Sequence, residues 1–269
     1  MSEHNIWLAF GLTTIAGLST GIGSLVAFIA KRTNTKFLCA SLGFSAGVML
    51  YVSFMDLIPI AKEELVLHFG EKTGMLSLLF AFFGGMGLIT LIDFLIPEPN
   101  NPHELLGIEE MSKPGNLRIS LHRKGILVAF ALAIHNFPEG IATFTSAVSS
   151  GLSVAIPITI AIAIHNIPEG IAVSVPIYHA TGNKRKAFWL SFLSGLAEPL
   201  GALVAFLFLI PVWTPLINGM IMAAVAGIMV YISLDELLPT AEKYGEHHLS
   251  ISGLIAGMIL MALSLYLFI

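Results

Sequence analysis

The chain has 269 residues, of which 56% are apolar and 11% are charged, and its formal net charge at pH 7 is -4. Soluble domains average about 25% charged residues, so this chain has too few charged side chains to cover the surface of a soluble globule. It also has no basic excess with which to contact nucleic-acid phosphates. The composition therefore excludes soluble, disordered and nucleic-acid-binding proteins and predicts an integral membrane protein.

Apolar runs separated by polar breaks predict eight transmembrane helices and an all-α fold, because backbone that crosses a bilayer must satisfy its own hydrogen bonds. The chain, 1–269, is predicted to be a single transmembrane domain. Its predicted spans are 6–30, 37–60, 74–96, 125–149, 153–178, 187–210, 213–238 and 249–269. The connection at 97–124 is rich in Pro, Asn, Glu and basic residues, and we expect a flexible cytoplasmic loop there.

The basic residues predict how the chain is oriented. With eight spans, the termini and three connections lie on one side of the membrane, where Lys62 and Lys72 are the only Lys or Arg residues. The four connections on the other side hold 11 of the 13: Lys31, Arg32, Lys36, Lys113, Arg118, Arg123, Lys124, Lys184, Arg185, Lys186 and Lys243. The positive-inside rule then predicts a multi-pass protein of the cytoplasmic (inner) membrane with both termini extracytoplasmic.

Two internal repeats indicate how the helices are related. Residues 46–61 and 226–241 share 8 of 16 positions, and residues 131–142 and 161–172 share 10 of 12. Both pairs fall on helices predicted to run in opposite directions, so the repeat is inverted across the membrane plane. Inverted repeats that meet near the midplane are typical of secondary transporters. The predicted architecture is 3+2+3, two related three-helix units around a central pair.

The second repeat carries ionisable side chains into the membrane. On a helix, Glu139 shares a face with both His135 and Asn136, and His165, Asn166 and Glu169 repeat this arrangement from the facing helix. Neither helix contains Lys or Arg to neutralise the acids, and intramembrane acids are candidate functional residues by default. Imidazole and carboxylate together suit Zn²⁺, Fe²⁺, Mn²⁺ and Co²⁺.

A third acid, Glu198, lies in the middle of the sixth predicted helix, directly before Pro199. The candidate ligands then fall into two adjacent metal sites. The His-rich site would use His135, Glu139, His165 and Glu169, and the amide-rich site would use Asn136, Asn166 and Glu198, with Glu139 and Glu169 bridging the two. The alternative is a buried polar network that joins the two helices without a metal ion.

The doubled HNxPEG motif at 135–140 and 165–170, the Ala-Glu-Pro sequence at 197–199 and the 3+2+3 repeat resemble the ZIP family of metal-ion transporters. The resemblance covers essentially the whole chain. It implies uptake of zinc, and of Fe²⁺, Mn²⁺, Co²⁺ or Cd²⁺, into the cytoplasm through a binuclear site, with the metal as substrate and no resident cofactor. It implies ligand roles for His135, Asn136, Glu139, His165, Asn166, Glu169 and Glu198.

Some members of that family carry Gln-Asp where this chain has His165-Asn166, so the amide-rich site here has one acid fewer. The expected partners are divalent metal ions and the lipid bilayer, and a homodimer stays open. Two other function classes stay open as well. An intramembrane metalloprotease would need a glutamate free to act as general base, whereas every acid here is assigned as a ligand. A metal-sensing membrane protein would bind metal without carrying it.

Three further acids are candidates for the ion pathway. Asp56 lies near the predicted outer end of the second helix, where a negative charge would concentrate cations. The first repeat places Asp235 and Glu236 near the inner end of the seventh helix, as a matching exit. The alternative for each is an ordinary solvated helix end.

Overall fold

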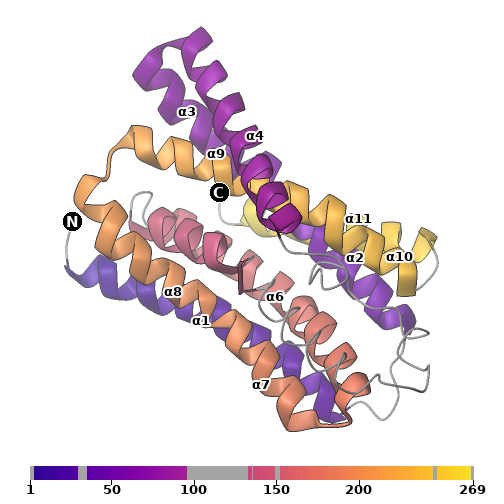
Figure 1. Cartoon of the computed structure of the whole chain (residues 1–269). Helices are drawn as coiled ribbons and strands as arrows, with labels where there is room; N and C mark the ends of the chain where they lie inside the picture. Colours follow the sequence, from indigo (N-terminus) through magenta and orange to yellow (C-terminus); the bar gives the residue numbers. More distant parts are fainter. Residues whose placement is uncertain are drawn as a thin grey trace.

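The computed structural model describes residues 3–29, 35–95, 133–134, 136–148, 152–244 and 247–267. Within these ranges the chain is helical apart from short turns, and it contains no strand (Figure 1). The predicted loop at 97–124 and one predicted ligand, His135, lie outside the described residues. The first part of the helix predicted at 125–149 also lies outside them, and its residues 136–148 are helical.

Long apolar helices account for most of the described chain. Six stretches are long and apolar enough to cross a membrane, namely Ile6–Leu25, Cys39–Phe69, Glu71–Ile92, Lys184–Val212, Pro215–Glu242 and His247–Tyr266. Large apolar side chains, including Phe80, Phe83 and Leu91, are exposed on the outer surface, as expected where a protein faces lipid. The chain is therefore an all-α, multi-pass membrane protein, and the number of eight spans stays a prediction.

The helices form two groups, as Figure 1 shows. In one group α1 (Glu3–Ile29) packs along α6 (Leu152–Thr181), α7 (Lys184–Gly195) and α8 (Ala197–Val204). The other group comprises α2 (Thr35–Val52), α3 (Ile58–Phe69), α4 (Glu71–Leu95), α9 (Pro215–Ile232), α10 (Leu238–Tyr244) and α11 (His247–Leu267). In this second group α2 packs along α11, and α9 packs along α3 and α4.

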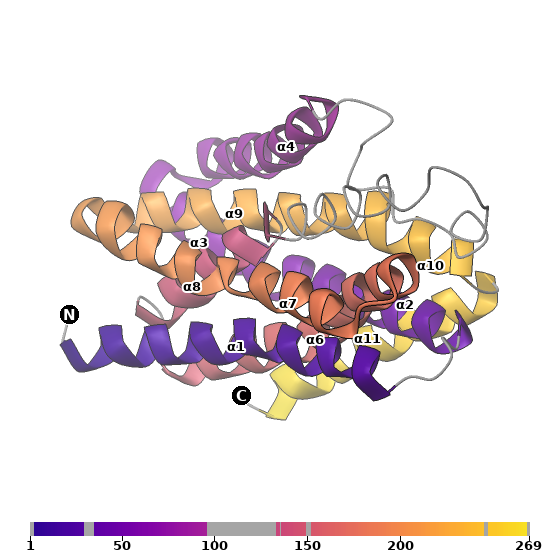
Figure 2. The same ribbon diagram turned by 60° about the horizontal axis from the view of Figure 1, so that its bottom comes forward.

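The two groups meet chiefly where α2 packs against α6. The largest apolar cluster among the described residues lies mainly in the second group, with Leu42 and Met49 of α2 and Met222 of α9, and it extends to Ala161 and Ile171 of α6. In both views, the start of α1 and the end of α11 lie toward the same end of the molecule (Figures 1 and 2).

The second predicted helix continues well past its predicted end near residue 60. It passes through a short π-helical segment, Ser53–Leu57, and continues as α3 to Phe69, where Gly70 ends it with a φ of 77°. Pro59 lies just after the π-helical segment, and because proline has no backbone N–H it cannot donate the helical hydrogen bond of its position. Glu and Lys are good helix formers, so loss of apolar character after residue 60 marks a change of surroundings and does not end the helix.

The same π-helical interruption occurs twice, at matching positions of the first repeat. Ser53–Leu57 and Ser233–Leu237 are both π-helical, and their sequences lie opposite each other in the alignment of 46–61 with 226–241. In each, the serine hydroxyl donates a 2.8 Å hydrogen bond to the carbonyl four residues earlier, at Met49 and at Met229. The repeat is therefore visible in backbone geometry as well as in sequence.

Candidate metal centre

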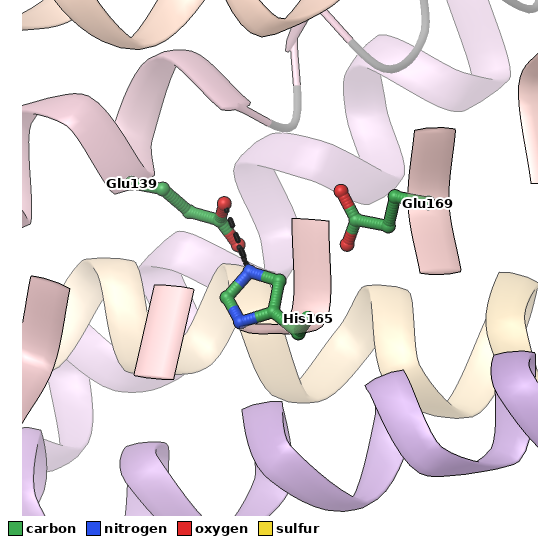
Figure 3. Close-up of side chains that lie close together, drawn as sticks. All are labelled: Glu139, His165 and Glu169. Atoms are coloured by element: carbon green, nitrogen blue, oxygen red, sulfur yellow. Dashed lines mark hydrogen bonds and ion pairs between the residues drawn. The ribbon is translucent and has the colours of Figure 1, made fainter. Parts of the chain in front are cut away.

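Two carboxylates and one imidazole meet inside the protein. Glu139 comes from the helical residues 136–148, and His165 and Glu169 lie one turn apart on α6. Each offers one ligand atom, and these atoms all lie within 4.8 Å of one another. All three side chains are buried. Figure 3 shows the carboxylates of Glu139 and Glu169 pointing toward each other from opposite sides, with the His165 ring beside them.

The distances within this cluster suit metal coordination. His165 Nε2 lies 3.2 Å from both carboxylate oxygens of Glu139. Ser45 on α2 approaches the cluster from the other helix group, with its hydroxyl 3.5 Å from Glu169 Oε1 and 3.4 Å from the His165 carbonyl oxygen. Buried imidazole and carboxylate groups within one coordination sphere of each other form a donor set that zinc prefers.

The predicted amide-rich residues are also buried, close to a break between two helices. Glu198 lies in the first turn of α8, which begins at Ala197, and Leu196 separates α8 from the end of α7 at Gly195. The Asn166 side-chain amide donates to Glu198 Oε1 and, at 3.0 Å, to the Ala16 carbonyl. The Asn136 amide donates to the Ser194 carbonyl at 3.2 Å. The Oδ1 atoms of both asparagines have no hydrogen-bond partner within the described part of the chain, so the amide oxygens are free to bind a cation.

Charge favours a cation at this position. Glu139, Glu169 and Glu198 are buried in segments that carry no Lys or Arg, namely 136–148, α6 and α8. An ionised carboxylate inside a membrane protein needs a partner that offsets its loss of hydration. A divalent ion bound between the carboxylates would provide that partner.

Comparison with known proteins identifies the family. Residues 98–265 match the family described as ZIP Zinc transporter. Proteins called Zinc transporter ZupT are similar along their whole length: that of Clostridium perfringens is 57% identical over 279 residues, covering 99% of this chain and 98% of the relative. That of Streptococcus mutans is 59% identical and that of Nitratidesulfovibrio vulgaris 53%, each covering 100% of both chains. The chain belongs to the ZIP family.

Membership of the ZIP family confirms two predictions made from the motifs. The resemblance of the doubled HNxPEG motif to that family was correct, and the chain is a membrane transporter rather than an enzyme. The intramembrane metalloprotease is thereby excluded. The ligand roles of the individual residues stay predictions.

The predicted pathway acids of this ZIP-family chain do not belong to the buried cluster. Asp56 is half-buried in the π-helical segment Ser53–Leu57. Of the matching pair in Ser233–Leu237, Glu236 is buried and Asp235 is exposed. The group whose ligand atoms lie together consists of Glu139, His165 and Glu169, so the roles of the pathway acids also stay predictions.

Sequence reasoning missed Ser45. Serine and threonine are common in membrane helices, and nothing in the local sequence distinguishes this serine from others that bond to their own helix. Its position beside Glu169 follows from the packing of α2 against α6. A signal of this kind comes only from the tertiary structure.

Proposed function

We propose that this chain imports Zn²⁺ into the cytoplasm through a binuclear site in the membrane. The observation that carries the proposal is the convergence of Glu139, His165 and Glu169 within one buried coordination sphere. The whole-length relatives named zinc transporters support zinc as the ion carried. In this proposal His135 completes the His-rich site, Asn136, Asn166 and Glu198 form the amide-rich site, and Glu139 and Glu169 bridge the two.

In the mechanism that we propose, the ion enters near one copy of the first repeat and leaves near the other. Asp56 and neighbouring acids attract hydrated cations on the extracytoplasmic side. The ion exchanges water for carboxylate and imidazole at the centre, and leaves toward Asp235 and Glu236 at the cytoplasmic end of the seventh span. The contact between the two helix groups is made mainly by α2 and α6, which supports alternating access by rocking of one group against the other.

We also propose that Fe²⁺, Mn²⁺, Co²⁺ and Cd²⁺ use the same site. Imidazole and carboxylate ligands accept all of these ions, and their affinities follow the intrinsic order of the metals more than the identity of the protein. The proposed topology has eight spans in a 3+2+3 arrangement in the cytoplasmic membrane, with both termini extracytoplasmic.

Uptake of radioactive zinc into proteoliposomes tests the proposal. Glu139→Ala and Glu169→Ala each remove a central carboxylate, and uptake should fall to the level of empty liposomes. Glu71→Ala is the matched control, because Glu71 is exposed in the first turn of α4. Insertion of each variant is checked by its yield from the membrane and its elution as a single species. Normal uptake by both central variants would overturn the binuclear site, and zinc binding without uptake by the wild type would favour a sensor.

A further inference from the structure

Helix α1, in the first half of the inverted repeat, is the counterpart of α7 and α8 in the second half. The sequences 17–28 (GLSTGIGSLVAF) and 195–206 (GLAEPLGALVAF) share 7 of 12 positions without a gap. This alignment pairs Gly17 with Gly195, and these two glycines face each other in the structure, each against the carbonyl oxygen of the other. The same alignment pairs Thr20 with Glu198.

Contacts with the two helices of the doubled motif also pair Thr20 with Glu198. The motif glycine Gly170 lies against the Thr20 carbonyl, and its counterpart Gly140 lies against the Glu198 carbonyl. A side chain added at Gly195 would meet Thr20, and one added at Gly17 would meet Glu198. Thr20 is therefore the structural counterpart of the predicted metal ligand Glu198.

The two asparagines of the doubled motif repeat this symmetry through hydrogen bonds. Asn166 donates to the carbonyl of Ala16, four residues before Thr20, and Asn136 donates to the carbonyl of Ser194, four residues before Glu198. In membrane helices a threonine hydroxyl commonly donates to the carbonyl four residues earlier. Thr13 does so, with a 2.9 Å bond to the Ala9 carbonyl. The carbonyl that Thr20 would use in this way already accepts Asn166.

The Thr20 hydroxyl is consequently buried without the backbone hydrogen bond that Thr13 makes. The residue is 1% exposed, and its Oγ1 has no hydrogen-bond partner among the described residues. It lies against Gly195, the neighbour of the residue that accepts the Asn136 amide. Buried polar atoms are nearly always bonded to protein, water or an ion. A threonine side chain is two bonds shorter than a glutamate side chain, so the hydroxyl would reach the centre of the site through a water molecule.

We infer that Thr20 is a further residue of the amide-rich site, where its hydroxyl holds a water molecule that is bound to the metal ion beside Asn136 and Asn166. This inference rests on the proposed function. Thr20 thus supplies a neutral group where the two-fold repeat would place a second acid, and Glu198 is the only acid that the pair of equivalent positions contributes. Thr20 acts on the ion through water and is a positioning residue.

Zinc binding to the purified full-length protein, measured by equilibrium dialysis with radioactive zinc, tests this inference. Thr20→Val removes the hydroxyl at nearly constant shape and should weaken one zinc-binding constant about fivefold, the value of one net hydrogen bond. Thr20→Ser keeps the hydroxyl and should restore binding. Thr13→Val is the matched control, because Thr13 is equally buried on the same helix and bonds to its own backbone.

Thr20→Asp gives a second measurement in the opposite direction. A carboxylate at this position restores the acid expected from the repeat and should tighten zinc binding. Equal binding constants for Thr20→Val and Thr13→Val would overturn the inference, and so would a Thr20→Asp protein that binds zinc no more tightly than the wild type. Failure of the proposed function is recognised separately, by retained uptake in Glu139→Ala and Glu169→Ala.

Discussion

Gly17 of α1 and Gly195 of α7 meet backbone to backbone, because the carbonyl oxygen of each occupies the space where a Cβ atom of the other would lie. The two residues are equivalent in the inverted repeat, so the pseudo-two-fold axis passes between them. Close approach of small residues is how membrane helices gain packing energy without a hydrophobic driving force. This contact brings Thr20 and Glu198, one turn further along, to the two sides of the candidate metal centre.

The first prediction concerns this contact. Gly17→Ala should lower the stability of the protein by about 1–3 kcal/mol, because the added methyl group forces apart two helices whose backbones touch. Thermal unfolding of the detergent-solubilised protein measures the change. Gly11→Ala is the control on the same helix, since nothing lies within 4 Å of a Cβ at Gly11. A Gly17→Ala protein as stable as Gly11→Ala would contradict the observed packing.

The sequence predicted that side chains of the two motif helices converge, and their roles as metal ligands stay predictions. The doubled motif placed Glu139, His165 and Glu169 together because antiparallel helices carrying the same spacing bring their acids to one depth, and the structure does bring these three together. Helix ends were harder to predict. Hydropathy indicates where a segment leaves the lipid, not where its helix ends. The helix that ends at Phe69 continues through Lys and Glu residues beyond the apolar segment.

The contribution of α1 was present in the sequence and was not recognised. The segments 17–28 and 195–206 differ at Thr20 and Glu198, the pair that includes a candidate ligand. They agree at Gly, aliphatic and Phe positions, which are common in any membrane helix. The symmetric contacts in the structure, first among them the reciprocal contact of Gly17 and Gly195, distinguish this similarity from a composition effect. Ser45 had no such repeat, because the position aligned with it in α9 is Val225.

The second prediction concerns the choice of metal. His165→Gln keeps a hydrogen-bonding side chain of similar length but replaces the imidazole beside Glu139 with an amide. Imidazole favours zinc over manganese, whereas amide and carboxylate oxygens suit manganese. Zinc uptake should therefore fall by more than manganese uptake. Competitive uptake of the two ions into proteoliposomes measures the ratio.

His68→Gln provides the matched control for that experiment, because His68 is an exposed histidine near the end of α3. It should leave the zinc-to-manganese ratio at its wild-type value. Equal losses of zinc and manganese uptake in His165→Gln would count against direct coordination by the imidazole.

The third prediction concerns capture of the ion. Asp56→Asn removes the charge of a half-buried acid that lies in the π-helical segment Ser53–Leu57. If that charge concentrates cations before they reach the centre, the KM for zinc should rise several-fold while the maximal rate changes little. The difference between the variant and the wild type should shrink as salt is added, because salt screens the attraction. A lower maximal rate at unchanged KM would instead assign Asp56 to a later step.

The fourth prediction concerns the paired π-helical segments. A π turn holds one residue more than an α turn, so deleting Leu234 from Ser233–Leu237 should convert the segment to regular α-helix and keep the register of α10. Leu234 is exposed, and its loss removes little packing. The variant should fold and insert nearly as well as the wild type. Its zinc uptake should fall, because the backbone that positions Asp235 and Glu236 has changed.

Deletion of Leu79 is the appropriate comparison, since Leu79 is an exposed residue in the regular helix α4. There the deletion rotates every later residue of the helix by about 100°, which turns the packed face of α4 away from α9. Thermal unfolding and zinc uptake should then distinguish the two deletions: the protein without Leu234 folds and transports poorly, and the protein without Leu79 does not fold. Equal instability of the two would mean that the π turn is required for folding and is not a separable device for placing the acids.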